Sequence, residues 1–139
     1  ENWRPHKLAD AVLLDAPCSA TGTIRRHPDL PHLKGKADVR RLAKIQSRLL
    51  RAAAEMVRPG GLLIYTVCSL QPEEGARIVN KFLMANKYFS REHIDDRDPK
   101  ITTSFRTENG DLQTLPCHWP KFGGLDGFFA ARLIRQETS

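Results

Sequence analysis

The 139-residue sequence predicts an α/β fold in which parallel strands alternate with crossover helices and a terminal antiparallel hairpin completes the sheet. Two continuous apolar runs, residues 11–14 and 62–67, indicate buried strands, and we expect the first to be buried on both faces. A stretch with helical periodicity lies between these runs, and another follows the second run. Hydrophobic content of 40% and charged content of 27% are ordinary for a globular domain.

The first strand is expected at residues 10–15, because Pro17 lacks a backbone donor and stops the ladder. Residues 16–36 then form a long loop, too rich in proline and glycine for regular structure. Asp38 is a good N-cap for the next helix. The apolar stripe of this helix recurs at three- and four-residue steps: Val39, Leu42, Ile45, Leu49, Ala53 and Met56. The Pro-Gly-Gly segment at 59–61 ends the helix and turns the chain into the second strand, residues 62–66.

The second half begins with another helix, in which Pro72 occupies the first turn and the chain stays helical to about residue 86. Glu73 and Glu74 would lie near the positive end of its dipole. Short strands are expected at residues 88–94 and 111–115 and a final buried strand at 127–134, with a loop at 95–110 and a turn at 116–124. The last two strands are close in sequence, which favours an antiparallel hairpin.

Several classes of protein are disfavoured by composition. No apolar run approaches the roughly 18–20 residues of a membrane span, and no charged-then-apolar leader opens the chain, so we expect a cytoplasmic protein. The three cysteines have no Cys-x-x-Cys spacing and the five histidines have no metal-ligand spacing, so we expect no metal site.

Positive charge is concentrated in one part of the chain. The formal net charge is +6, and residues 25–51 contain nine basic residues against two aspartates. A local excess of this size suits a polyanion such as nucleic acid, and a solvated helix face is the alternative interpretation.

Chemistry-bearing side chains follow both predicted strands. Asp15 and Cys18 come at the end of the first strand, and Cys68 follows the second. The carboxyl ends of parallel strands form the ligand-binding edge of open α/β sheets, so we expect a site there. Structural alternatives are a turn-capping role for Asp15 and small buried thiols for the two cysteines.

The motifs at these positions resemble the RNA 5-methylcytosine methyltransferases, and within them the bacterial enzymes that methylate 16S ribosomal RNA. The resemblance covers residues 10–135 and rests on these elements: Asp-Ala-Pro-Cys-Ser at 15–19, Thr21-Gly22, Arg-His-Pro-Asp at 26–29, Gln46, Pro-Gly-Gly at 59–61, Tyr-Thr-Val-Cys-Ser at 65–69, Glu73-Glu74 and Gly-Leu-Asp-Gly-Phe-Phe at 124–129. It implies the C-terminal half of a Rossmann-like S-adenosylmethionine-dependent methyltransferase fold.

The resemblance also implies roles for individual residues. Cys68 would add to C6 of cytosine, and Cys18 would help the covalent product to separate, as an acid–base group. A position just before a helix N-terminus and near basic side chains would favour the Cys68 thiolate. Asp15 would contact the cytosine edge or the cofactor, S-adenosylmethionine, and Pro17 would also contact the cofactor. RNA contacts are expected from the basic segment, in particular from Arg25, Arg26, His27, Lys44 and Arg48.

The sequence departs from the family pattern in several places. The glycine-rich cofactor loop and the N-terminal RNA-binding region are not among these residues, so we expect 1–139 to be a partial catalytic domain, inactive by itself. Its first strand would then lack a neighbour, which predicts self-association of the isolated chain. Ala20 stands where the family commonly has glycine, and Cys117 has no assigned role.

Three other functions stay open at this point. The chain can be a nucleic-acid-binding fragment without catalysis. It can instead belong to a methyltransferase that acts on an exocyclic nitrogen, although such enzymes typically have an Asn-Pro-Pro-Tyr or Asp-Pro-Pro-Tyr motif where residues 15–18 have Asp-Ala-Pro-Cys. A dithiol redox protein is a third alternative, disfavoured by the spacing of the thiols.

Overall fold

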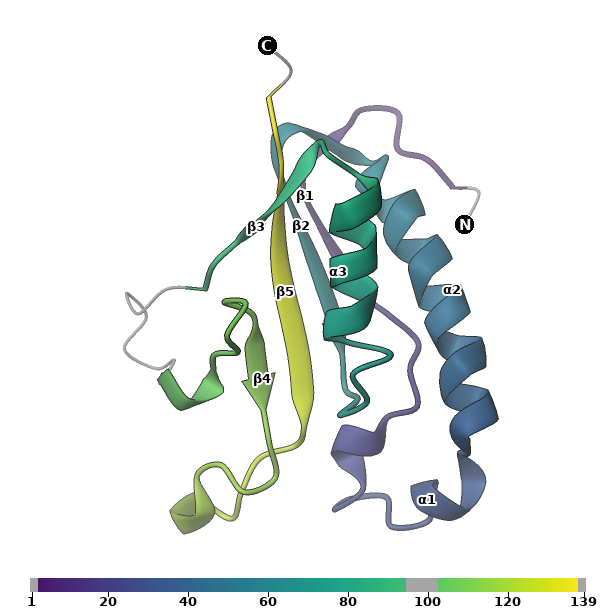
Figure 1. Cartoon of the computed structure of the whole chain (residues 1–139), viewed down its shortest axis with the longest axis vertical. Coiled ribbons are helices and arrows are strands. Elements are labelled where there is room, and N and C mark those ends of the chain that lie inside the picture. Colours follow the sequence, from purple (N-terminus) through teal and green to yellow (C-terminus); the bar gives the residue numbers. More distant parts are fainter. Residues whose placement is uncertain (1–2, 95–102, 138–139) are drawn as a thin grey trace.

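The computed structural model describes residues 3–94 and 103–137, which form one mixed five-stranded sheet with its two longer helices packed on one face (Figure 1). The strands are β1 (Ala9–Asp15), β2 (Val57–Val67), β3 (Phe89–Glu92), β4 (Leu112–Thr114) and β5 (Phe128–Arg135). The helices are α1 (Leu30–Leu33), α2 (Lys36–Ala54) and α3 (Ala76–Ala85), and three short 3₁₀ turns lie at Thr21–Thr23, Thr103–Phe105 and Pro120–Phe122.

The strand order is β1-β2-β5-β3, with β4 paired to β5 beside this path. β1 and β2 are parallel and are joined by α2, as the strand–helix–strand pattern predicts. β5 is antiparallel to β2, β3 and β4. The predicted fold class and the terminal β4–β5 hairpin are therefore confirmed, and β5 additionally enters the sheet between β2 and β3.

The starts of α2, α3 and β2 differ from the sequence prediction by several residues. α2 begins at Lys36 with Gly35 as N-cap, and Asp38 lies in its first turn, where its carboxylate accepts a 3.1 Å bond from the Gly35 N–H. α3 begins only at Ala76, so Pro72 precedes the helix. The Pro-Gly-Gly segment lies inside β2, where the β1–β2 register shifts between Ala9 and Ala11. Such an irregularity tolerates a proline that a regular central strand would not.

The first strand is not buried on both faces. Val12 and Leu14 pack against the core, but Leu13 on the opposite face is 67% exposed. Within the described residues β1 pairs with β2 alone and is an edge strand, and the helices cover only one face of it. A continuous apolar run predicts two covered faces only when packing layers lie on both sides.

The core lies between the sheet and the two helices. Fully buried side chains come from β2, α2, α3 and β5, among them Leu63, Tyr65, Leu50, Val79 and Leu133. The loop at 16–36 contains a 3₁₀ turn and the single helical turn α1, more regular structure than its composition predicts. Much of the predicted 95–110 loop lies outside the described residues. Among the helices that the structure describes, none has the length and apolarity to cross a membrane.

Candidate active site at the ends of two strands

The two thiols predicted to share a sheet edge lie next to each other. Cys18 follows the end of β1 and Cys68 follows the end of β2, and their Sγ atoms are 3.5 Å apart. Both side chains are half-buried. The parallel register pairs Asp15 with Thr66, so the two strands end at the same level and bring both thiols to one place.

Asp15 and Pro17 lie at the same edge and are exposed. The Thr66 hydroxyl donates a 3.1 Å hydrogen bond to Oδ1 of Asp15. The Pro17 carbonyl accepts a 2.9 Å bond from Nε2 of Gln46 on α2. Asp15 therefore presents a carboxylate to solvent at the sheet edge where the thiols lie, while the backbone of Pro17 is held by the helix.

A buried carboxylate, that of Glu74, joins the turns that follow the two strands. Its Oε2 accepts 2.5 Å bonds from the hydroxyls of Ser19 and Ser69, each of which follows one of the two cysteines. Its Oε1 accepts bonds from the Ser19 backbone N–H at 2.9 Å and from Gln46 Nε2 at 3.1 Å. A buried charge is costly unless it is fully hydrogen-bonded, and four donors satisfy this one. The spacing between the thiols depends on this carboxylate.

Sequence analysis missed the roles of Gln46 and Glu74. Glu74 directly precedes Gly75, the N-cap of α3, so it lies near the start of that helix as predicted, but its complete burial is not predicted. The sequence does contain one signal for such a buried acceptor, because Cys-Ser follows both strands. Two serine hydroxyls buried at one sheet edge need a hydrogen-bond partner, and one carboxylate can serve both.

Burial distinguishes Cys18 chemically. Loss of hydration raises the pKa of the Cys18 thiol to about 12, and the adjacent Cys68 adds to the increase. Cys18 is therefore protonated at neutral pH. The helix dipole expected to favour a Cys68 thiolate is not adjacent, because α3 begins only at Ala76.

Positive charge reaches the thiols from Arg26. Its guanidinium donates from Nε to Oδ2 of Asp126 at 2.7 Å, and this carboxylate is the main cause that raises the pKa of Arg26, with a smaller contribution from Cys68. Arg25 and His27 are exposed in the same loop. Lys44 and Arg48 line a groove between α2 and α3 instead. The basic segment thus supplies two separate surfaces.

Two glycines hold the Cys18 loop against the start of β5. Gly127 N–H donates a 2.7 Å bond to the Gly22 carbonyl, and Gly22 N–H donates a 3.0 Å bond to the Cys68 carbonyl. A Cβ on Gly22 would overlap with the carbonyl oxygen of Gly127. Only glycine fits here, which explains why Thr21-Gly22 and the Asp-Gly-Phe-Phe motif occur together.

Among residues 3–94 and 103–137, no three His, Cys, Asp or Glu side chains are placed to hold a metal ion. Asp15 and Pro17, to which the resemblance assigns cofactor contacts, are exposed at this edge of the sheet.

A mixed sheet of this order, with paired thiols at the ends of adjacent parallel strands, defines an α/β domain of the methyltransferase class. The chain belongs to the 16S rRNA methyltransferase RsmB/F family, whose model matches residues 1–134.

Relatives of known name agree with this assignment. The chain is 38% identical over 138 residues to ribosomal RNA small subunit methyltransferase B of Klebsiella pneumoniae (strain 342), covering 99% of this chain and 29% of the relative. Identity to the protein of the same name from Sodalis glossinidius is 40%, covering 99% and 28%. The crystal structure of NSun6 from Pyrococcus horikoshii with SFG superimposes with a TM-score of 0.75 at 27% identity, over 96% of this chain and 32% of that one. The chain thus spans under a third of the length of these relatives.

Replacing Glu74 by glutamine tests the buried network. In Glu74→Gln an NH₂ group replaces one of the accepting carboxylate oxygens and faces hydrogen-bond donors. We therefore expect this variant to lower the free energy of unfolding by about 3 kcal/mol. The matched control is Glu73→Gln, which breaks only a surface pair with Arg77 and should cost less than about 1 kcal/mol. Urea unfolding of the complete protein measures both. Equal costs for the two variants would contradict the assigned role of Glu74.

Ala20 offers a test in the opposite direction. It has a left-handed backbone conformation, φ 58°, which glycine adopts more easily than alanine. Removing the Cβ relieves about 1–2 kcal/mol of strain in the folded state. Glycine also gives the unfolded chain more conformational freedom, which reduces this gain in stability by about 0.4–1 kcal/mol. We therefore expect Ala20→Gly to stabilise the protein by about 0.5–1 kcal/mol in thermal or urea unfolding. Ala52→Gly, inside α2, should destabilise it by about 1 kcal/mol, and a loss of stability in both variants would refute the strain argument.

Proposed function

We propose that this chain is part of the catalytic domain of an S-adenosylmethionine-dependent RNA methyltransferase that methylates C5 of cytosine, with 16S ribosomal RNA as its substrate. The observation that carries the proposal is the 3.5 Å contact between Cys18 and Cys68 in a chain of the RsmB/F family. C5 of cytosine is a weak nucleophile, and a thiol that adds to C6 activates it. Such chemistry requires one nucleophilic thiol, and a second thiol beside it provides acid–base chemistry.

The difference in environment supports Cys68 as the nucleophile. A pKa of about 12 keeps Cys18 as a thiol at neutral pH, so Cys18 does not supply the attacking thiolate. Cys68 lies at the same edge, and the Arg26 guanidinium interacts with it electrostatically. In the proposed reaction Cys68 Sγ forms a bond to C6 and thereby places electron density on C5. S-adenosylmethionine supplies the methyl group that C5 takes up.

Product release requires transfer of the C5 proton to solvent water, formation of the C5–C6 double bond and cleavage of the Cys68–C6 bond, in which the electron pair returns to Sγ. Cys18 Sγ, 3.5 Å from Cys68 Sγ, is positioned to donate a hydrogen bond to the departing sulfur and so assist its release. The Asp15 carboxylate, exposed at the same sheet edge, accepts a hydrogen bond from the 4-amino group of the cytosine or contacts the cofactor. Pro17 forms part of the cofactor surface. A structural relative solved with SFG, an S-adenosylmethionine analogue, supports this cofactor.

The target base must be unpaired or flipped to reach the thiols. Arg25, Arg26 and His27, in the loop beside the site, would contact phosphates near the target nucleotide, and Lys44 and Arg48 would do so farther away. The substrate places this activity in the cytoplasm. The exposed outer face of β1 is the surface on which we expect the remaining catalytic domain to pack, and self-association of the isolated chain stays a prediction.

The nucleophile is tested by Cys68→Ala in the complete protein. We expect methyl transfer to unmodified 16S RNA to fall at least about 1000-fold, because no other group can add to C6. Cys117→Ala removes the exposed thiol elsewhere in the chain and should retain normal activity. Transfer of radiolabelled methyl groups measures both variants, and normal turnover by Cys68→Ala would refute the proposal.

The role of Cys18 is tested by trapping the intermediate. With Cys18→Ala the bond between Cys68 and C6 should form but break slowly, so a protein–RNA adduct should accumulate on denaturing gels. The double variant Cys18→Ala/Cys68→Ala should give none. Absence of an adduct with Cys18→Ala alone would contradict a role in product release.

A further inference from the structure

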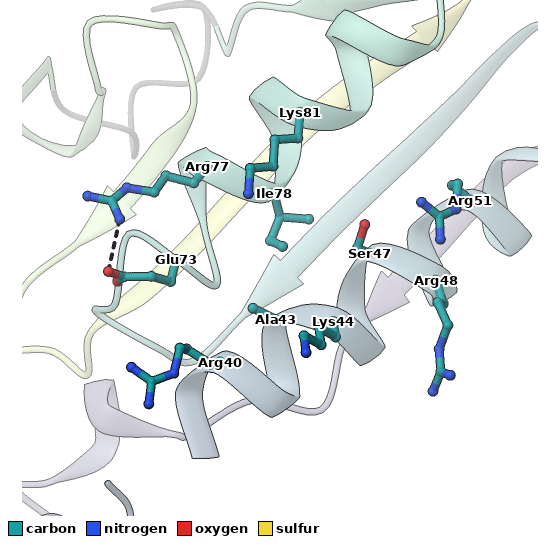
Figure 2. A pocket seen from close by; sticks show the side chains of 10 residues that line it. All are labelled: Arg40, Ala43, Lys44, Ser47, Arg48, Arg51, Glu73, Arg77, Ile78 and Lys81. Atoms are coloured by element: carbon teal, nitrogen blue, oxygen red, sulfur yellow. Dashed lines mark hydrogen bonds and ion pairs between the residues drawn. The ribbon is translucent and has the colours of Figure 1, made fainter. Parts of the chain in front are cut away.

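A groove of about 580 Å³ lies between α2 and α3, on the helical face of the sheet (Figure 2). Its floor is formed by small and apolar side chains, those of Ala43, Ser47 and Ile78. The remaining lining residues are charged: Arg40, Lys44, Arg48, Arg51, Glu73, Arg77 and Lys81. A floor without bulky groups leaves room for an extended chain between the two rows of charged side chains.

The groove concentrates nearly all the excess charge of the protein. Six basic side chains face a single carboxylate, so the groove carries five of the six net positive charges of the whole chain. Glu73 is already paired with Arg77 at 2.9 Å. Arg40, Lys44, Arg51 and Lys81 form no ion pair with any residue that the structure describes. Cations gathered in this way repel one another, which favours a bound polyanion.

The cations form two rows that begin near the thiol site. On α2, residues 40, 44, 48 and 51 follow helical spacing along one face and extend over about 16 Å. On α3, residues 77 and 81 form the facing row. Because a crossover helix starts where the preceding strand ends, Arg40 lies toward the catalytic edge and Arg51 at the far end. In Figure 2, Arg40, Glu73 and Arg77 lie toward one end of the groove, and Arg48 and Arg51 lie toward the other.

We infer that this groove binds the phosphate backbone of the RNA next to the target nucleotide, so that the strand runs from the thiol edge along the space between α2 and α3. The inference rests on the proposed function, which makes RNA the substrate. Guanidinium and ammonium groups in rows match the repeated charges of a phosphate backbone, and Arg pairs with phosphate through two hydrogen bonds. Six cations in two facing rows match negative charge that is repeated at regular intervals, as it is on every nucleotide of RNA, so we favour RNA over an acidic segment of protein.

The sequence predicts only half of this surface. The basic face of α2 is expected from the sequence to contact RNA, but Arg77 and Lys81 on α3 complete the second wall only after packing. Arg26, which belongs to the same basic segment as α2, pairs instead with Asp126. The groove therefore differs from the basic segment in both residues and position.

The inference is tested by the variant Lys44→Glu/Lys81→Glu in the complete protein, with one charge reversed in each wall. Binding to a single-stranded RNA oligonucleotide is measured by fluorescence anisotropy at several salt concentrations. We expect affinity at about 0.1 M salt to fall at least 10-fold and the slope of log affinity against log salt to decrease by about 0.7 for each phosphate that the protein no longer neutralises. Lys44→Gln/Lys81→Gln should show the same smaller slope, which excludes misfolding as the cause.

The matched control is Lys7→Glu/Lys87→Glu, which changes the net charge equally at exposed positions near the amino ends of β1 and β3. It should keep the wild-type slope. Equal loss of affinity in the control pair, or no loss in the groove pair, would overturn the inference. Unchanged RNA affinity with a lower unfolding temperature would show that the groove holds an acidic protein segment instead.

These outcomes are separate from the proposed function. Groove-dependent RNA binding by a wild-type protein that transfers no methyl group would support the groove and contradict the catalysis. Methyl transfer by the wild-type protein, together with normal RNA binding by the groove variant, would support the catalysis and contradict the groove.

Discussion

The geometry of the candidate site depends on the buried carboxylate of Glu74. Transfer of an ionised carboxyl group out of water costs several kcal/mol unless hydrogen-bond donors replace the lost solvent. Ser19, Ser69 and Gln46 provide these donors, and each belongs to a different part of the chain. Because none of them can move without leaving the charge unsatisfied, the two thiol-bearing turns and α2 are held in one arrangement. The hydroxyl of Tyr65 adds a 2.5 Å bond to the Glu74 carbonyl, which fixes the backbone as well.

Rigid turns have a chemical consequence for the thiols. Two sulfur atoms 3.5 Å apart in a half-buried site cannot both carry a negative charge at low cost. Burial and the neighbouring sulfur both act against a Cys18 thiolate, whereas Arg26 lies close enough to Cys68 to interact with it electrostatically. Arg26 is itself positioned by Asp126, directly before the glycine that packs on Gly22. The start of β5 thus contributes to the asymmetry between two cysteines that are equivalent in sequence pattern.

Local signals in the sequence were sufficient to predict where the two parallel strands end and that the two thiols lie together. Apolar runs that end at Asp15 and Cys68 fix two parallel strand ends, and parallel ends meet at one edge whatever the remaining fold. The same reasoning failed where the outcome depends on distant partners. Whether β1 is covered on both faces depends on layers beyond the run itself, and Leu13 is exposed. The insertion of β5 between β2 and β3, and the burial of Glu74 but not Glu73, are decided by tertiary contacts that periodicity does not encode.

The distribution of positive charge over the folded surface also differs from its distribution along the sequence. A basic segment in the sequence became two surfaces, one beside the thiols and one between two helices. These surfaces are joined by two consecutive acidic residues. Glu73 pairs with Arg77 at the groove, while Glu74 turns inward and holds Ser19 and Ser69. Because Glu73 and Glu74 are consecutive, the wall of the groove and the network behind the thiols meet in one turn of the chain.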